Sequence, residues 1–212
     1  IAVTPNAPNT LYAALISGPY RSTDGGTTWT KTPTTGLTTA FAQTIAVDPA
    51  NSSIVYLAPV NFGLWRSVNG GNNWSQVNLP PNRGTVFSIV FDPVTPSTMY
   101  VGYGAGVAKS TDGGTTWTHI GTLIGGATVN PLGVRALAID PTTPTTMYAG
   151  TAGSPGLFKS TNGGTTWVQM NNGMVNANTV NTIVIDPFDA QTVYAGSGFI
   201  GGGGGGINKT TN

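Results

Sequence analysis

The segment Ser22-Thr-Asp-Gly-Gly-Thr-Thr-Trp29 decides the fold, because close copies of it return along the whole chain. Complete copies occupy residues 67–74, 110–117 and 160–167, and a fifth copy begins at residues 209–212. Tryptophans at positions 29, 74, 117 and 167 place these copies 43 to 50 residues apart. We call the four complete copies the repeat turns. A period of about 40–50 residues predicts a β-propeller, in which each repeat forms one four-stranded blade.

Each repeat contains four short segments with strand character. Residues 182–186, 192–196, 156–160 and 167–170 exemplify the predicted strands A, B, C and D. Strand A is a continuous apolar run, which is typical of a strand buried on both faces. Strand B carries an aligned tyrosine in every repeat: Tyr12, Tyr56, Tyr100, Tyr148 and Tyr194.

The sequence therefore predicts an all-β fold, a β-propeller of five repeats with four-stranded antiparallel blades and an incomplete last blade. The predicted units are approximately residues 1–43, 44–87, 88–135, 136–181 and 182–212, which form a single domain or part of one. The fifth blade either has three strands, or receives a fourth from a neighbouring chain, or belongs to a larger ring.

The repeat turn has a structural role that its residue types explain. An Asp or Asn side chain accepts hydrogen bonds from backbone N–H groups a few residues on, and paired glycines adopt positive φ angles. The Trp buries a large apolar surface beside the turn. We assign this role to the following residues: Ser22, Asp24, Trp29, Ser67, Asn69, Trp74, Ser110, Asp112, Trp117, Ser160, Asn162 and Trp167.

The pattern Ser-x-Asp-x-Gly-x-x-Trp resembles the Asp-box, or BNR, repeat, and the resemblance covers nearly the whole chain. Proteins with this repeat include sialidases, xyloglucanase-like glycosidases, sortilin-type receptors and photosystem assembly factors. The resemblance thus implies a propeller, with six to eight blades more usual than five, but it does not imply one function.

The acidic residues argue against catalysis. The chain has no Glu, and its seven Asp residues all fall in turns: Asp24, Asp48, Asp92, Asp112, Asp140, Asp186 and Asp189. The resemblance implies an Arg triad, an Asp and a Tyr–Glu pair in sialidases, and two facing Asp residues in xyloglucanase-like enzymes. Because nothing distinguishes one repeated Asp from another, we predict that the chain is not an enzyme. With no Cys and a single His, His119, we predict no metal site and no cofactor.

Charge and hydropathy limit the partners. A net charge of +1 without a basic cluster disfavours nucleic acid, and no apolar run is long enough to span a membrane. The weakly charged, Thr-rich composition predicts an extracellular or cell-surface location, with the periplasm as an alternative. One cation precedes each of the four repeat turns and the partial fifth copy, and we expect a solvated ring, or alternatively a ring that binds polyanions: Arg21, Arg66, Lys109, Lys159 and Lys209.

Strand alternation predicts that the A–B and C–D turns lie on one face and the variable B–C and D–A loops on the other. We expect any protein or glycan partner on the variable face. The candidate binding residues there are Phe41, Phe62, Trp65, Arg83, Tyr103, Arg135 and Phe199. One position just before strand A is expected to ring the mouth of the central channel, with residues Gln43, Phe87, Arg135 and Asn181.

The leading functional hypothesis is a non-catalytic extracellular interaction or scaffold module. The alternative is a carbohydrate-binding or glycoside-hydrolase-like propeller fragment of the xyloglucanase type, because sugar rings stack on exposed aromatic side chains. An assembly factor is a further alternative, and the incomplete last blade allows self-association.

Overall fold

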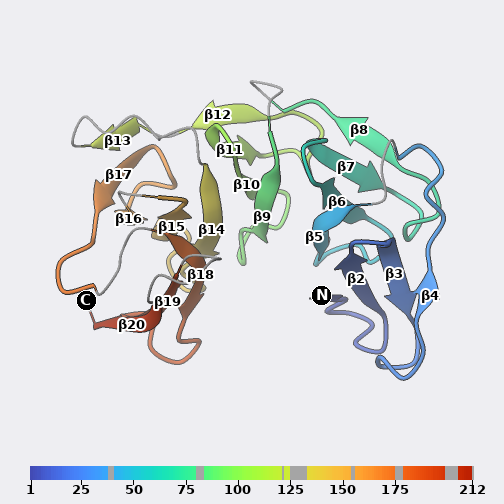
Figure 1. Ribbon diagram of the computed structural model, residues 1–212, viewed down its shortest axis with the longest axis horizontal. Helices are drawn as coiled ribbons and strands as arrows, with labels where there is room; N and C mark the ends of the chain where they lie inside the picture. Colours follow the sequence, from blue (N-terminus) through green and yellow to red (C-terminus); the bar gives the residue numbers. More distant parts are fainter. Residues whose placement is uncertain are drawn as a thin grey trace.

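The computed structural model describes residues 1–37, 41–79, 84–120, 122–124, 133–153, 156–174, 179–198 and 205–211, with the backbone alone described for 122–124 and 211. Its strands form five sheets that stand side by side in an arc (Figure 1). These residues contain no helix, so this part of the chain has no helix that could cross a membrane. The predicted all-β propeller fold is confirmed.

The first three sheets are antiparallel and four-stranded, and strand order in space follows strand order in the chain. The first sheet contains β1 (Ala2–Val3), β2 (Leu11–Leu15), β3 (Gly18–Ser22) and β4 (Thr30–Lys31). The second contains β5 (Ala42–Val47), β6 (Val55–Pro59), β7 (Leu64–Ser67) and β8 (Ser75–Val77). The third contains β9 (Val86–Phe91), β10 (Met99–Tyr103), β11 (Gly106–Ser110) and β12 (Thr118–Ile120).

The last two sheets depart from this pattern. The fourth contains β14 (Val134–Ile139), β15 (Met147–Thr151), β16 (Leu157–Ser160) and β17 (Thr166–Gln169), and β13 (Thr122–Ile124) adds to the outer edge of β17 in parallel. The sequence predicted only a loop here. The extra strand pairs with backbone N–H and C=O groups of β17 that would otherwise face solvent at the edge of the sheet. The fifth sheet contains β18 (Val180–Ile185), β19 (Thr192–Ser197) and β20 (Gly206–Thr211).

The first strand of each sheet lies on the inside of the arc, and the last strands lie on the outside (Figure 1). Successive inner strands β1, β5, β9, β14 and β18 pack against one another along the chain. Hydrophobic clusters fill the spaces between neighbouring sheets. Burial on both faces explains why the sequence of strand A is continuously apolar instead of alternating.

The repeat turns close as their residue types predict. In the third sheet, Ser110 Oγ donates to Asp112 Oδ1 over 2.8 Å and accepts the Gly114 N–H over 2.9 Å. Asp112 Oδ1 also accepts the Thr116 N–H over 2.8 Å, and Trp117 Nε1 donates to the Gly114 carbonyl over 3.0 Å. Gly114 has a φ of +75°, which favours glycine. The turn is thus held by its own side chains.

The two acidic repeat turns give the stability a pH dependence. Hydrogen bonds from the Thr28 hydroxyl and N–H, and then from Ser22, lower the pKa of Asp24 to about 2. The equivalent bonds lower the pKa of Asp112 to about 2. An Asp in an unfolded chain has a pKa near 3.9. The stabilisation that these carboxylates provide is therefore complete above about pH 4 and is lost as the pH falls towards 2.

We expect the double variant Asp24→Asn/Asp112→Asn to lose less stability than the parent chain between pH 4 and pH 2. Asn already serves at the same position in two other repeats, where Asn69 Oδ1 accepts the Asn73 N–H over 2.9 Å without titrating. Urea midpoints measured at pH 7, 4, 3 and 2 test this expectation. Identical losses in the variant and the parent would contradict it.

Strand B tyrosines join each sheet to the next. Tyr12 Oη donates to the carbonyl of Gly70 over 3.3 Å, and Tyr56 Oη donates to that of Gly113 over 2.7 Å. Both acceptors lie in the repeat turn of the following sheet. Tyr12, Tyr56, Tyr100 and Tyr148 are buried, whereas Tyr194 in the fifth sheet is half-buried. Tyr100 and Tyr148 belong to hydrophobic clusters shared with the following sheet, so the first four aligned tyrosines are contacts between sheets.

The cations that precede the five copies of the repeat segment make contacts that the sequence analysis did not predict. Four of them are half-buried and Lys209 is exposed, so the expected solvated ring stays a prediction. Each lies over the ring of the strand B tyrosine opposite it, at 5.3 to 6.0 Å from the ring centroid: Arg21 over Tyr12, Arg66 over Tyr56, Lys109 over Tyr100, Lys159 over Tyr148 and Lys209 over Tyr194. The direct cross-strand register, such as Tyr12 opposite Arg21, brings the pair together. These cation–π contacts occupy the cations within their own sheets.

Backbone hydrogen bonds between loops confirm the two predicted faces. The Gly113 N–H in a repeat turn bonds to the Ser97 carbonyl in the A–B turn of the same sheet over 2.9 Å. On the opposite face, the Gly104 N–H in the B–C loop bonds to the Thr85 carbonyl just before strand A over 3.1 Å. Equivalent pairs recur in other sheets. We call these two surfaces the turn face and the loop face.

Candidate functional site on the loop face

A β-bulge interrupts four of the inner strands close to the loop face. Ala42 pairs with Pro59 and Thr44 with Ala58, so Gln43 is an extra residue in β5. The same register shift leaves Phe87 extra in β9, Arg135 in β14 and Asn181 in β18. A bulge turns its extra side chain away from the regular alternation of the strand and is frequent beside functional sites. The position predicted to ring the channel mouth is therefore a bulge in four consecutive sheets.

The four bulge residues offer varied chemistry. The guanidinium of Arg135 lies over the Phe87 ring of the preceding sheet, 5.2 Å from its centroid. Arg135 Nε is buried and has no hydrogen-bond partner among the described residues. Asn181 Nδ2 donates to the Gly198 carbonyl over 2.9 Å, and both Asn181 and Gln43 are exposed. Amides, a cation and an aromatic ring thus occur at successive positions along the inner wall.

Two exposed aromatic side chains lie on the loop face of the second sheet. Phe41 immediately precedes β5 and is 56% exposed, and Phe62 lies in the loop between β6 and β7 and is 44% exposed. The Val60 N–H bonds to the Phe41 carbonyl over 2.9 Å, so the two loops that carry these rings are joined. Exposed aromatic surface on a fixed backbone is typical of a binding site.

The loop that carries Phe62 is also fixed to the third sheet. The Asn61 N–H donates to Thr85 Oγ1 over 3.0 Å, and the Thr85 hydroxyl donates to Asn61 Oδ1 over 2.9 Å. Asn61 has a φ of +65°, in the left-handed region that asparagine adopts more readily than most residues. Thr179 supports the fourth B–C loop similarly, by accepting the Gly153 N–H over 3.0 Å.

Two sequence-predicted residues are buried instead of presented to a ligand. Tyr103 is 1% exposed and belongs to β10, and its hydroxyl lies 2.9 Å from Nδ1 of His119, which is exposed on β12. Burial raises the pKa of Tyr103 to about 12. Trp65 is 5% exposed and donates from Nε1 to the Phe62 carbonyl over 3.1 Å. Neither ring offers a face for stacking, so these two expectations are corrected. Arg83 and Phe199 lie outside the described residues.

The carboxyl groups lie away from the bulges and are engaged in turns. Asp48, Asp92, Asp140 and Asp186 each accept backbone N–H groups of the A–B turn through Oδ1, at 2.8 to 3.3 Å. Burial tends to raise the pKa of Asp140, but hydrogen bonds from Thr142 and Thr143 together with nearby Lys159 lower it overall. A glycosidase acid requires a shift in the other direction. No group of three His, Cys, Asp or Glu side chains in the described part of the chain could hold a metal ion.

The turn face has a concave feature that the sequence did not predict. A cavity of about 640 Å³ includes at least one proline from every repeat in its wall: Pro5, Pro49, Pro93, Pro96, Pro141 and Pro187. Apolar residues at the ends of β9, β14 and β18 complete it. The Asp-Pro pairs could have predicted this cavity from the sequence. Each pair follows an inner strand, and the inner strands all end on the turn face, so the prolines that follow them lie close together.

The sequence matches no family model. Over 163 residues it is 33% identical to the xyloglucanase Xgh74A of Acetivibrio thermocellus, a match that covers 57% of this chain and 19% of that protein. It is 30% identical over 164 residues to a xyloglucanase of a Paenibacillus species, covering 57% of this chain and 16% of that protein. The chain thus spans less than a fifth of the length of these curated relatives.

Solved structures include similar propellers. An ancestral GH74 enzyme superposes with a TM-score of 0.77 and 27% identity, covering 92% of this chain and 26% of the enzyme. YCF48 from Cyanidioschyzon merolae gives a TM-score of 0.64 with 16% identity, covering 99% of this chain and 66% of that protein. An identity this low shows a shared fold alone. The chain is therefore a β-propeller that is similar in sequence to part of the xyloglucanases.

Proposed function

We propose that this chain is a glycan-binding portion of an extracellular propeller of the xyloglucanase type, and that its loop face binds a β-glucan chain such as xyloglucan. The observation that carries the proposal is the pair of exposed rings, Phe41 and Phe62, on two joined loops. The apolar face of a sugar ring stacks on such aromatic side chains. The similarity to xyloglucanases supports a polysaccharide as the ligand.

The bulge residues extend the same surface towards the inside of the arc. Gln43 is two residues from Phe41, and its exposed amide supplies both a donor and an acceptor for sugar hydroxyls. Arg135 and Asn181 supply further donors in the fourth and fifth sheets. A few polar groups beside an aromatic platform are what a carbohydrate site requires for orientation.

We propose further that the chain binds this ligand without hydrolysing it. Glycosidases require two carboxyl groups about 5–10 Å apart, one of which has a raised pKa. Each of the seven Asp side chains here accepts hydrogen bonds within its own turn, and those of Asp24, Asp112 and Asp140 have lowered pKa values. We expect no release of reducing ends when the purified chain is incubated with xyloglucan, and a release that scales with protein concentration would contradict this.

Phe41→Ala and Phe62→Ala should each weaken binding to xyloglucan oligosaccharides about tenfold, which corresponds to about 1.4 kcal/mol. The loss arises because each substitution removes one stacking surface and leaves the backbone of the joined loops intact. Isothermal titration calorimetry with the parent chain and both variants measures it. Phe188→Ala is the matched control, because Phe188 is 99% exposed in an A–B turn on the opposite face.

Equal losses in all three variants would place binding elsewhere on the molecule. Failure of the parent chain to bind any polysaccharide in a panel of xyloglucan, cellulose oligosaccharides and xylan would overturn the glycan proposal. That result would favour the interaction scaffold, since a protein partner could use the same exposed aromatic surface.

A further inference from the structure

The two faces of the molecule differ in charge. The sequence contains seven Asp and no Glu, and the structure describes all seven. Two lie in repeat turns and five in A–B turns, where each accepts hydrogen bonds from its own turn. Both kinds of turn lie on the turn face. The described part of the loop face therefore carries no side-chain carboxylate, and its electrostatic potential depends on the cations there.

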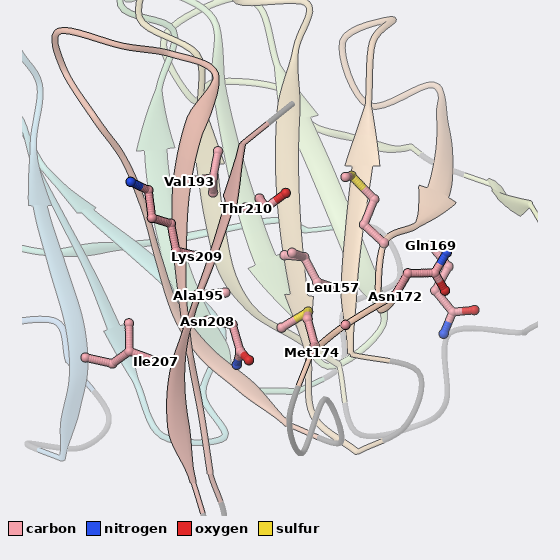
Figure 2. Close-up of a pocket in the computed structure, with 12 residues that line it drawn as sticks. Leu157, Gln169, Asn172, Met174, Val193, Ala195, Ile207, Asn208, Lys209 and Thr210 are labelled. Atoms are coloured by element: carbon pink, nitrogen blue, oxygen red, sulfur yellow. The ribbon is translucent and has the colours of Figure 1, made fainter.

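Most of the described basic side chains are held elsewhere. The five that precede the copies of the repeat segment lie over strand B tyrosines of their own sheets. One of these, Lys209 of β20, points away from the cavity of about 590 Å³ between the fourth and fifth sheets (Figure 2), and its Nζ lies 5.7 Å from the centroid of the Tyr194 ring. Lys31 belongs to β4, at the outer edge of the first sheet. Of the described basic side chains, only Arg135 lies on the loop face, at the bulge of β14.

Arg135 has no counter-ion among the described residues. Asp140 follows the opposite end of the same strand, and the five residues between these positions span roughly 16 Å of β-strand. That separation exceeds the screening length of about 8 Å at physiological ionic strength. The guanidinium of this half-buried residue is instead held over the Phe87 ring, 5.2 Å from its centroid, and its Nε has no hydrogen-bond partner among the described residues. The positive charge is thus fixed in place and unbalanced.

The chemistry around Arg135 favours one kind of anion. A planar guanidinium presents paired N–H donors that match the two oxygens of a carboxylate. One carboxylate also balances one positive charge, whereas a phosphate ester brings a charge of about −1.5 to −2. Asn181, at the bulge of the next sheet, is exposed, and its amide oxygen accepts hydrogen bonds from hydroxyl groups. Because β14 and β18 pack against each other, the cation and the amide can contact one small molecule that carries both a carboxylate and hydroxyls.

We propose that Arg135 and Asn181 form a subsite for a uronic acid residue, so that the glycan which the loop face prefers is a β-glucan that carries carboxylates. The guanidinium binds the carboxylate, and the amide oxygen of Asn181 accepts a hydrogen bond from a hydroxyl of the same sugar. The inference rests on the proposed glycan binding by Phe41 and Phe62. It assigns a different task to the inner wall, because aromatic stacking binds neutral and acidic sugars alike, whereas an unbalanced cation distinguishes them.

The test compares two ligands that differ only in carboxylates. They are xyloglucan oligosaccharides and the same oligosaccharides with free C6 hydroxymethyl groups oxidised to give uronic acids. In isothermal titration calorimetry the parent chain should bind the oxidised form about tenfold more tightly, as a charge-assisted hydrogen-bonded pair provides. Added salt should reduce this preference, because it screens the attraction. Since both ligands meet the same protein, this comparison does not depend on the folding of any variant.

A variant pair locates the subsite on the protein. Arg135→Gln retains an amide but loses the charge, so the preference for the oxidised form should disappear. Lys31→Gln is the matched control, because it removes the same charge from an exposed residue of β4 and should leave the preference unchanged.

The outcomes separate this inference from the proposed function. If the parent chain binds both forms equally, or if both variants lose the preference equally, the subsite is overturned and the aromatic platform remains. Binding of neither form would contradict glycan binding itself, and the subsite with it.

Discussion

Trp167→Ala is expected to lower the free energy of unfolding by about 3–5 kcal/mol, the range for large aromatic side chains removed from a core. Trp167 is 1% exposed and lies between two sheets, where it contacts a cluster with members from both. Alanine removes the indole and leaves a cavity that the rigid sheets on either side cannot close. For a chain of this size the melting temperature should fall by about 10 °C.

Trp29→Ala is the matched control for this substitution. Trp29 has the same place in the repeat, and its Nε1 donates to the Gly26 carbonyl over 3.0 Å. It is half-buried, because its sheet is the first of the arc and the described residues place no sheet before it. We expect a loss of about 1 kcal/mol, in proportion to the smaller area that it buries. Equal losses in urea unfolding would show that the turn, and not the interface, determines the contribution of the tryptophan.

Gly150→Ala is expected to destabilise the chain by about 1–3 kcal/mol through overpacking. Gly150 lies in β15, and a Cβ atom there would stand 2.6 Å from Cγ1 and 2.7 Å from the carbonyl oxygen of Val180 in the next sheet. The second contact is with backbone, so the two sheets would have to separate. Gly102 faces Val134 in the same way, with 2.8 Å to its carbonyl oxygen.

Gly206→Ala separates this steric effect from the general cost or gain of replacing glycine in a strand. Gly206 begins β20, and a Cβ atom there meets nothing within 4 Å. We expect a change within about 0.5 kcal/mol, as for other surface substitutions. Chemical denaturation of both variants provides the measurement, and a Gly150→Ala protein as stable as the parent would show that the sheets can move apart without loss.

The fold could be predicted from the sequence because every repeat contains the same local sequence patterns. The repeat turn, the apolar strand A and the aligned tyrosine recur in register, so an error in one copy would be corrected by the others. The same alignment of the repeats could also have predicted the cation–π pairs, because Arg21 and Tyr12 lie opposite each other once β2 and β3 are paired. Their two positions were identified, but the cross-strand register was not used to join them.

The candidate site was less predictable because it depends on departures from the repeat. Gln43, Phe87, Arg135 and Asn181 were aligned correctly, but a bulge depends on hydrogen-bond register, which the residue types do not encode. Tyr103 was assigned to a loop, yet the strand continues through it and buries its ring. The leading hypothesis of an interaction scaffold is not confirmed, and the similarity to xyloglucanases supports the glycan alternative instead.

The tyrosine contacts between sheets also set an order for folding during synthesis. The hydroxyl of Tyr12 donates to the carbonyl of Gly70, which lies 58 residues later in the chain. The hydroxyl of Tyr56 donates to the carbonyl of Gly113, which lies 57 residues later. The first and second sheets therefore each lack one polar partner until the following repeat turn emerges from the ribosome. Because domains form from the N-terminus during translation, we expect these two sheets to reach their final form one repeat behind the growing end.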